Sequence, residues 1–132
     1  LDLDGFKPIN DRYGHQAGDQ LLRAFAHRVT GILREGDVLA RLGGDEFVVL
    51  IEQLEQVEGA LAVADKIVEL GRRPFEIEGH RVRVACSLGI VFHPFSEVGA
   101  DELLSLADSA MYQAKRAGRG RVQIFCSTAT AA

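Results

Sequence analysis

Cysteine is scarce in this sequence, with only Cys86 and Cys126 among 132 residues. Two cysteines this far apart have the spacing neither of a zinc site nor of a disulfide framework. Both lie in apolar segments that are typical of strands, so we expect buried thiols. A chain without disulfides suits a reducing compartment, and we expect it in the cytoplasm, alone or as the cytoplasmic part of a membrane-anchored protein.

Positive charge is also in short supply, since 15 lysines and arginines face 19 aspartates and glutamates, for a formal net charge of −4. Proteins that bind the nucleic-acid backbone usually present a basic surface, so we expect no nucleic-acid partner. The charge is still compatible with a small anionic ligand that a metal ion neutralises.

Long hydrophobic runs are absent as well, because no stretch of these residues approaches the roughly 20 apolar positions that a membrane-spanning helix needs. Internal repeats, linkers and low-complexity tracts are equally missing. With 47% hydrophobic and 26% charged residues, the chain has the composition of a globular protein. We expect one domain over residues 1–126, followed by a small polar tail, 127–132.

The most informative stretch, residues 38–51, has two apolar runs joined by the pair Gly43-Gly44. Glycines between two such runs predict a β-hairpin, because glycine takes a positive φ without penalty. The second run is apolar throughout, so we expect a buried strand. Asp45 and Glu46 then lie at the tip of the hairpin, either as functional carboxylates or as ordinary polar residues of a turn.

The spacing of apolar residues predicts the other elements. In chain order they are a strand at 1–4, a short helical piece at 5–10, a helix at 19–34, the hairpin, a helix at 57–70, a two-stranded ribbon at 75–84, a strand at 85–92, a helix at 101–117 and a strand at 121–125. This order indicates an α+β fold, in which helices pack on a mostly antiparallel sheet.

Two acidic residues, Asp2 and Asp4, belong to the first expected strand. If that strand pairs with the hairpin, Asp2 and Asp45 converge, and two carboxylates about 4 Å apart repel by roughly 4 kcal/mol at an effective dielectric near 20. Either one of them is protonated or a cation lies between them, and oxygen ligands of this kind suit Mg²⁺. Spacing alone leaves open the alternative that Asp2 and Asp4 simply end a strand in solvent.

Basic residues gather at the end of the last expected helix, where Lys115 and Arg119 stand four positions apart. They fit either a cationic clamp for phosphates or the general preference of basic residues for helix C-termini. His15 lies in a glycine-rich loop, as a helix cap or as a ligand contact. No serine or cysteine stands in an arrangement with a histidine and an acid that would support nucleophilic catalysis.

Four blocks of the sequence together resemble the GGDEF domain of diguanylate cyclases, which make cyclic di-GMP from two molecules of GTP. The blocks are Asp2-x-Asp4-x-Phe6-Lys7-x-x-Asn10-Asp11-x-x-Gly14-His15-x-x-Gly18-Asp19, Arg41-x-Gly43-Gly44-Asp45-Glu46-Phe47, Ser87-Leu88-Gly89 and Ala107-Asp108-x-Ala110-Met111-Tyr112-x-Ala114-Lys115-x-x-Gly118-Arg119. They occur in the family's order and at its spacing, and they cover nearly all of residues 1–126. The resemblance implies a ferredoxin-like nucleotidyl cyclase fold, similar to the palm of polymerases.

The resemblance also implies roles for individual residues. Mg²⁺, or Mn²⁺, would be held by the side chains of Asp2 and Asp45 and by the backbone carbonyl of Leu3. The implied catalytic acids are Asp45 and Glu46. The implied substrate-binding residues are Asn10 and Asp19 for guanine with His15 nearby, Gly43 and Gly44 at the triphosphate, and Lys7, Lys115 and Arg119 for phosphates.

Each domain of the family holds one GTP, so the resemblance implies a homodimer with a second GGDEF domain. The ribose 3′-hydroxyl of one GTP would attack the α-phosphate of the other, and pyrophosphate would leave. Arg34-x-x-Asp37 matches the family's product-inhibition site, where an arginine can engage the guanine edge. The alternative is that Arg34 caps a helix and Asp37 begins a strand.

A regulatory function is the rival hypothesis, because residues 73–80 resemble versions of the domain that are fused to an EAL phosphodiesterase domain. Such a module would bind GTP or cyclic di-GMP without turnover. Another metal-dependent nucleotidyl transferase is a third possibility. The family's domain normally begins earlier, with a helix and most of the first strand, so we expect a piece of a longer protein that carries a sensor domain, an EAL domain or both. Gly120 stands where the family usually has asparagine, a minor departure.

Overall fold

The computed structural model describes residues 1–51, 56–92 and 99–125, so Cys126 and the predicted tail lie outside the described part of the chain. Its elements are β1 (Asp2–Asp4), α1 (Phe6–Tyr13), α2 (His15–Thr30), β2 (Val38–Gly43), β3 (Glu46–Leu50), α3 (Val57–Arg72), β4 (Phe75–Ile77), β5 (His80–Val82), β6 (Ala85–Val91), α4 (Ala100–Arg116) and β7 (Val122–Phe125). The predicted order of elements and the α+β fold class are confirmed. Among the described residues, no helix is long and apolar enough to cross a bilayer.

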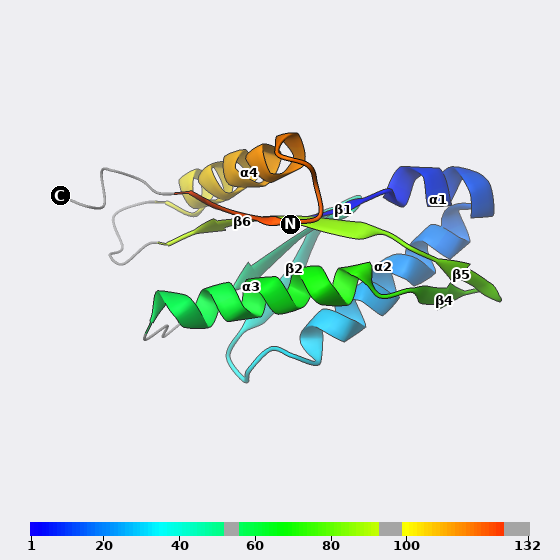
Figure 1. Ribbon diagram of the computed structural model, residues 1–132. Coiled ribbons are helices and arrows are strands. Elements are labelled where there is room, and N and C mark those ends of the chain that lie inside the picture. Colours follow the sequence, from blue (N-terminus) through cyan, green and yellow to red (C-terminus); the bar gives the residue numbers. More distant parts are fainter. Residues whose placement is uncertain (52–55, 93–98, 126–132) are drawn as a thin grey trace.

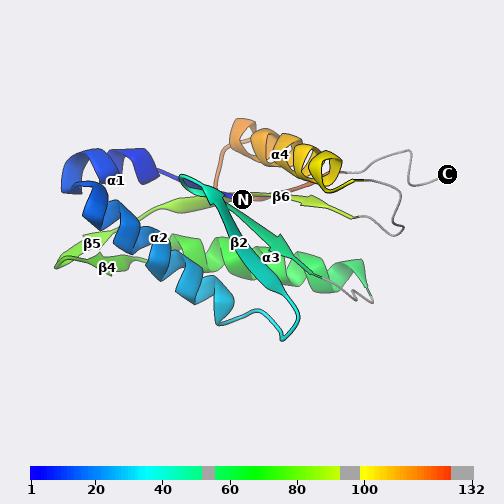
Figure 2. The same cartoon turned by 180° about the vertical axis from the view of Figure 1, so that it is seen from behind.

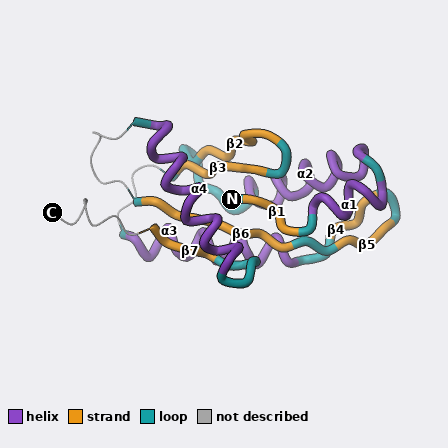
Figure 3. Tube along the Cα trace, turned by 90° about the horizontal axis from the view of Figure 1, so that it is seen from above, coloured by secondary structure: helices purple, strands orange, loops and turns teal. Residues whose placement is uncertain are grey.

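The main sheet has five strands in the order β2-β3-β1-β6-β7, and β4 and β5 form a separate ribbon. The pairs are antiparallel except for β6 and β7, which run parallel. The short strand β1 therefore lies in the middle of the sheet, between the hairpin and β6 (Figure 3). Its first residue, Asp2, stands opposite Glu46 on one side and Ser87 on the other. This register brings the opening aspartate next to the hairpin tip.

Helices cover the sheet on both sides. Figure 1 shows α4 on one side and α3 on the other, and Figure 2 shows α2 on the same side as α3. The core lies mainly between the sheet and the α2–α3 layer, and its largest fully buried side chains include Phe25, Phe75, Leu3, Leu21 and Ile67. Burying each such side chain is worth about 1.5–3 kcal/mol, so this layer holds the strands in place.

Close packing on the other side depends on a glycine of β6. A Cβ atom at Gly89 would lie 2.3 Å from the backbone nitrogen of Met111 and 2.4 Å from the carbonyl oxygen of Ala107. Because no side chain intervenes, α4 rests directly on β6. This contact sets the height of the helix that carries Lys115 above the sheet.

Two expectations about local structure were wrong. The helix expected at 19–34 begins at His15 and ends at Thr30. It begins earlier than expected because Gly14, with a φ of 94°, separates it from α1. The second hairpin strand is not buried throughout, since Phe47 is buried but Leu50 is 50% exposed. An apolar run does not reveal whether one face or both faces of a strand are covered.

The ribbon of β4 and β5 lies beside the corner between α1 and α2 (Figure 1). The rings of Tyr13 and His80 have centroids 4.6 Å apart, and Gln20 donates a hydrogen bond to Glu78 over 3.3 Å. At the other end of the ribbon, Arg28 of α2 lies over the ring of Phe75 and donates hydrogen bonds to backbone carbonyls at the end of α3 and just after it. These contacts tie the ribbon to α2 at both ends.

Candidate functional site

The two aspartates of β1 are buried, with Asp2 8% and Asp4 7% exposed. The alternative that they end a strand in solvent is therefore wrong. The Oδ1 atom of each is buried without a hydrogen-bond partner among the described residues. Leaving a buried acceptor unpaired costs about 1–3 kcal/mol or more when it is charged, so oxygens of this kind fit a role as ligands of a hard cation.

Asp45 follows the glycine pair of the hairpin and adjoins β1, because its carbonyl oxygen accepts a hydrogen bond from the Leu3 amide over 3.4 Å. Burial, a hydrogen bond with Asp2 and the charge of Asp2 together raise the pKa of Asp45 to about 6, and the charge of Lys115 keeps it from rising further. The predicted convergence of Asp2 and Asp45 is confirmed. Two acids that share one site in this way hold a proton or a cation more readily than either acid alone.

The hairpin tip that carries Asp45 is fixed from both sides. Phe47 is buried, and its ring centroid lies 5.4 Å from that of Phe25 on α2. At the turn, Gly43 and Gly44 have φ values of 152° and 52°, and a Cβ atom at either position would meet nothing within 4 Å. Arg41 donates a hydrogen bond from Nε to the Gly44 carbonyl over 2.9 Å. The turn is therefore open to an approaching ligand, and the packing of Phe47 and the hydrogen bond from Arg41 hold it in place.

Lys115, in the last turn of α4, points at the aspartates of β1. Its Nζ donates a hydrogen bond to Asp2 Oδ2 over 2.6 Å and lies 3.8 Å from Asp4 Oδ1. Burial by itself lowers the pKa of Lys115, but the hydrogen bond to Asp2 and the charges of Asp2, Asp4 and Asp45 outweigh it, and the pKa is raised. The guanidinium of Arg119 lies 3.9 Å from Asp4 Oδ1. Both basic residues thus belong to the acidic centre, and the helix dipole is only part of the reason for their position.

A buried network around Asp4 escaped the sequence analysis. Ser87 donates a hydrogen bond from Oγ to Asp4 Oδ2, and the Gly120 amide approaches Asp4 Oδ2 at 3.2 Å and Ser87 Oγ at 3.3 Å. Arg72 donates to the carbonyl of Gly120 over 2.7 Å. The network fixes the turn that carries Arg119. Gly120 has a φ of 57°, a region that asparagine also adopts, so its departure from the family pattern changes little.

A second group of predicted residues gathers at the corner between α1 and α2. The side-chain nitrogen Nδ2 of Asn10 lies 2.9 Å from Nδ1 of His15. Asp19, exposed in the first part of α2, lines a groove of about 410 Å³ whose walls also include Arg41 and Phe47 of the hairpin. This groove links the corner to the hairpin. Lys7 is exposed at the start of α1, in the helix that directly follows β1.

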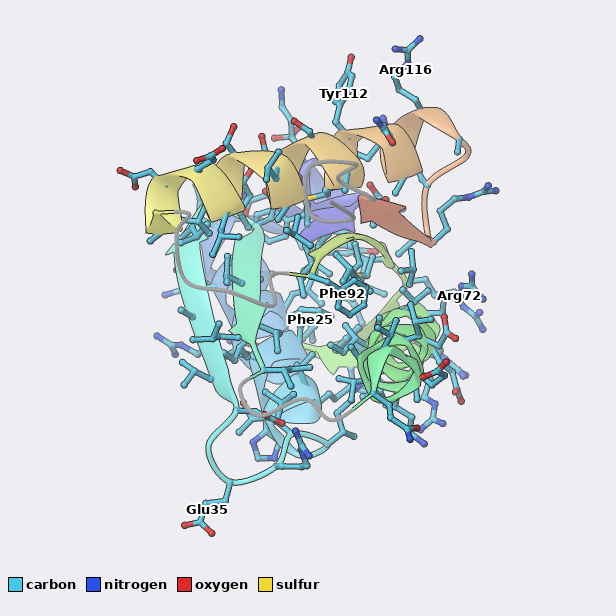
Figure 4. The ribbon with its side chains drawn as sticks, turned by 90° about the vertical axis from the view of Figure 1, so that its left-hand side faces the viewer. Phe25, Glu35, Arg72, Phe92, Tyr112 and Arg116 are labelled. Atoms are coloured by element: carbon cyan, nitrogen blue, oxygen red, sulfur yellow. The ribbon has the colours of Figure 1, made fainter. Side chains whose placement is uncertain are left out.

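Arg34 and Asp37 lie together in the loop between α2 and β2. The Arg34 amide donates a hydrogen bond to Asp37 Oδ2 over 2.9 Å, and the Arg34 Nε atom lies 3.6 Å from the same oxygen. Because α2 ends at Thr30, Arg34 does not cap that helix, and β2 begins one residue after Asp37. The side chain of Arg34 is 62% exposed. Figure 4 shows the neighbouring Glu35 pointing into solvent at the tip of the loop.

The site combines buried acids, an open glycine turn and two basic residues at the centre of an α+β fold. This combination is typical of a nucleotidyl cyclase domain. A family model described as "Diguanylate cyclase, GGDEF domain" matches residues 1–121. The chain therefore belongs to the GGDEF domain family.

Similar proteins include two curated relatives and one solved structure. MucR of Pseudomonas aeruginosa, named a bifunctional diguanylate cyclase/cyclic di-GMP phosphodiesterase, is 45% identical over 131 residues, which are 99% of this chain and 19% of MucR. PdeR of Escherichia coli, named a cyclic di-GMP phosphodiesterase, is 43% identical over 125 residues, 95% of this chain and 19% of PdeR. The crystal structure of the GGDEF domain of TpbB (YfiN) from P. aeruginosa has a TM-score of 0.89 and 43% identity, covering 96% of this chain and 80% of that one. The chain thus spans about a fifth of the length of MucR and of PdeR.

Proposed function

We propose that this domain is a diguanylate cyclase, which condenses two GTP molecules into cyclic di-GMP and pyrophosphate. The observation that carries the proposal is the meeting of three acids, Asp2, Asp4 and Asp45, with Lys115 and Arg119 beside an open glycine turn. Acids that fit a divalent cation stand beside bases that fit phosphates, and phosphoryl transfer needs both. Membership of the GGDEF family supports the same reaction.

The residues present fit a Mg²⁺ or Mn²⁺ ion. Asp2 has an unpaired buried oxygen, Asp45 shares a site with it, and the backbone carbonyl of Leu3 would be the third ligand. Within the described ranges, no three His, Cys, Asp or Glu side chains cluster as metal ligands. The protein would thus supply only part of the shell, which is usual for Mg²⁺ at nucleotide phosphates. When bound, the ion would neutralise phosphate charge and make the attacking hydroxyl more acidic.

The chain's own residues would position one GTP. Lys115, Arg119 and Lys7 would hold its phosphates, Gly43 and Gly44 would let the triphosphate approach the backbone, and Asn10 and Asp19, with His15 nearby, would bind guanine. Glu46, opposite Asp2 in the sheet, would complete the acidic pair with Asp45. In the reaction, the 3′-oxygen of one GTP forms a bond to the α-phosphorus of the other. The bond from that phosphorus to the oxygen that bridges it to the β-phosphate breaks, so pyrophosphate leaves, and the hydroxyl proton passes to a nearby base. The same step, from the 3′-oxygen of the second GTP to the α-phosphorus of the first, closes the ring and releases the second pyrophosphate.

One domain positions one GTP, so the reaction requires a homodimer in which a second GGDEF domain brings the other. Arg34 and Asp37 would bind the product. Asp37 fixes the loop by accepting the Arg34 amide and pairs with Nε of the same residue, and the terminal nitrogens of the exposed guanidinium would engage a guanine edge. A sensor domain, an EAL domain or both would lie elsewhere in the whole protein.

A regulatory module is the second candidate function, because both MucR and PdeR carry phosphodiesterase activity in their names. In that case the domain would bind GTP or cyclic di-GMP without turnover and control an attached domain. The full-length protein, incubated with GTP and Mg²⁺, separates the two functions by the amount of cyclic di-GMP that chromatography detects. The proposal predicts product that is lost in Asp45→Ala and retained in Asp65→Ala, a matched control on the exposed side of α3. Tight GTP binding without product, at a protein concentration that allows dimers, would favour the regulatory module.

A further inference from the structure

The side chain of Asn10 is confined between two residues of α2. Its Nδ2 atom lies 2.9 Å from Nδ1 of His15. A carboxamide nitrogen only donates, so this contact is a hydrogen bond from Asn10 to the His15 ring. The bond uses one of the two N–H groups of Asn10, so the side chain keeps a second donor and the acceptor Oδ1.

The Oδ1 atom of Asn10 occupies a space that any side chain at position 18 would fill. A Cβ atom at Gly18 would be 2.1 Å from Asn10 Oδ1, 3.0 Å from Asn10 Cγ and 3.1 Å from the ring of Phe6. Gly18 is buried inside α2, where its amide donates to the Gly14 carbonyl over 3.1 Å. Helix propensity alone would favour alanine there by about 1 kcal/mol. The position is therefore explained by the neighbouring side chain and not by the helix.

We propose that Gly18 is a specificity-determining position, which holds Asn10 in the orientation that distinguishes guanine from adenine. The inference rests on the proposed function, in which Asn10 contacts the base. Guanine presents an amino donor beside the N3 acceptor, whereas adenine presents only the acceptor. A carboxamide held in one orientation offers one donor and one acceptor side by side, a pattern that is complementary to guanine. Gly18 is a positioning residue, because it touches Asn10 and not the base.

Alanine at position 18 should change this orientation without unfolding the domain. The atom that would collide is the far end of a side chain with two rotatable bonds, so Asn10 would turn away while the backbone of α2 stays in place. The gain in helix propensity partly offsets the lost contacts. Gly31 offers a matched control, because it has a helical φ of −65° and a Cβ atom there would be no closer than 3.4 Å to its nearest neighbour, the carbonyl oxygen of Arg28.

The test measures binding of the α,β-methylene analogues of GTP and ATP to the full-length protein with Mg²⁺, which avoids turnover. Asn10→Ala and Gly18→Ala should each weaken binding of the GTP analogue by about five- to tenfold, which is the contribution of one hydrogen bond, and should change the affinity for the ATP analogue by no more than about twofold. The double variant should bind no more weakly than Asn10→Ala alone, and Gly31→Ala should match the wild type. If Gly18→Ala lowers the melting temperature, the double variant should recover it, because the colliding side chain is gone.

Three results would overturn the inference. They are unchanged GTP-analogue affinity in Gly18→Ala, equal weakening of both analogues, and an effect of Gly18→Ala that adds in full to that of Asn10→Ala. Unchanged affinity in Asn10→Ala is a different failure, since it removes the base contact on which the proposed function itself relies.

Discussion

Replacing Asp45 with asparagine should make the metal-free domain more stable while it destroys the proposed activity. In the folded protein burial and the neighbouring Asp2 raise the pKa of Asp45 from 3.8 to about 6. The ionised carboxylate is therefore less favourable in the folded state than in the unfolded chain. Asparagine keeps the shape of the side chain and removes the charge, so the repulsion disappears together with a proposed metal ligand.

The size of the effect follows from the pKa of Asp45. Each pKa unit corresponds to about 1.4 kcal/mol, so a rise from 3.8 to about 6 corresponds to about 3 kcal/mol at most. Asp45 is only half-buried, and screening by solvent reduces this to about 1–2 kcal/mol. Between these pH values the folded protein keeps a proton that the unfolded chain has lost. Stability therefore falls as the pH rises from about 4 to about 6, and the full cost is present above that window.

Thermal unfolding in EDTA measures the difference. At pH 7.5 Asp45→Asn should melt about 3–8 °C above the wild type, and the gap should close below about pH 4, where the wild-type carboxyl is protonated in both states. With Mg²⁺ and the α,β-methylene analogue of GTP, the wild type should gain stability and the variant should gain little. A variant that melts at or below the wild type in EDTA at pH 7.5 would refute the reasoning, because the two carboxylates would then not repel.

Three further predictions concern the surroundings of the site. Lys115→Met removes the cation that pairs with both β1 aspartates and should lower the cyclase rate by at least about a hundredfold. Arg116→Met is the control and should retain the rate, because the Arg116 side chain points away from the sheet in Figure 4. Equal rates in the two variants would contradict the assignment. Burial raises the pKa of the Cys86 thiol to about 12. In a Cys126→Ser background, a chromogenic thiol reagent at pH 8 should therefore label the protein only after denaturant is added, and rapid labelling of the native form would count against a buried thiol. Arg34→Ala should keep the initial rate and lose inhibition by added cyclic di-GMP, and an unchanged inhibition curve would exclude this loop as the product site.

Much of the site could be predicted because each strand and turn that carries it has a recognisable local pattern. The hairpin follows from apolar runs around Gly43-Gly44, and the approach of Asp2 to Asp45 needs only that β1 pairs with β3. The helices follow from the spacing of their apolar residues, although the break at Gly14 moved the start of α2.

Other features depend on contacts between distant parts of the chain, which no local pattern encodes. The Gly120 amide approaches the Asp4 carboxylate across 116 positions in the sequence, and Ser87 joins them from a third element. The exposure of Leu50 depends on how far the helices extend over the hairpin, which the strand's own residues do not specify. The packing of Asn10 against Gly18 likewise depends on how α1 and α2 cross, which neither helix specifies by itself.

The most direct test is a crystal structure of the domain with Mn²⁺ and the α,β-methylene analogue of GTP, with data collected to show anomalous scattering from manganese. The proposed function predicts an anomalous peak within bonding distance of carboxylate oxygens of both Asp2 and Asp45, with nucleotide phosphate oxygens completing the coordination and Lys115 moved onto a phosphate. A bound nucleotide whose metal ion lies away from these two aspartates would contradict it.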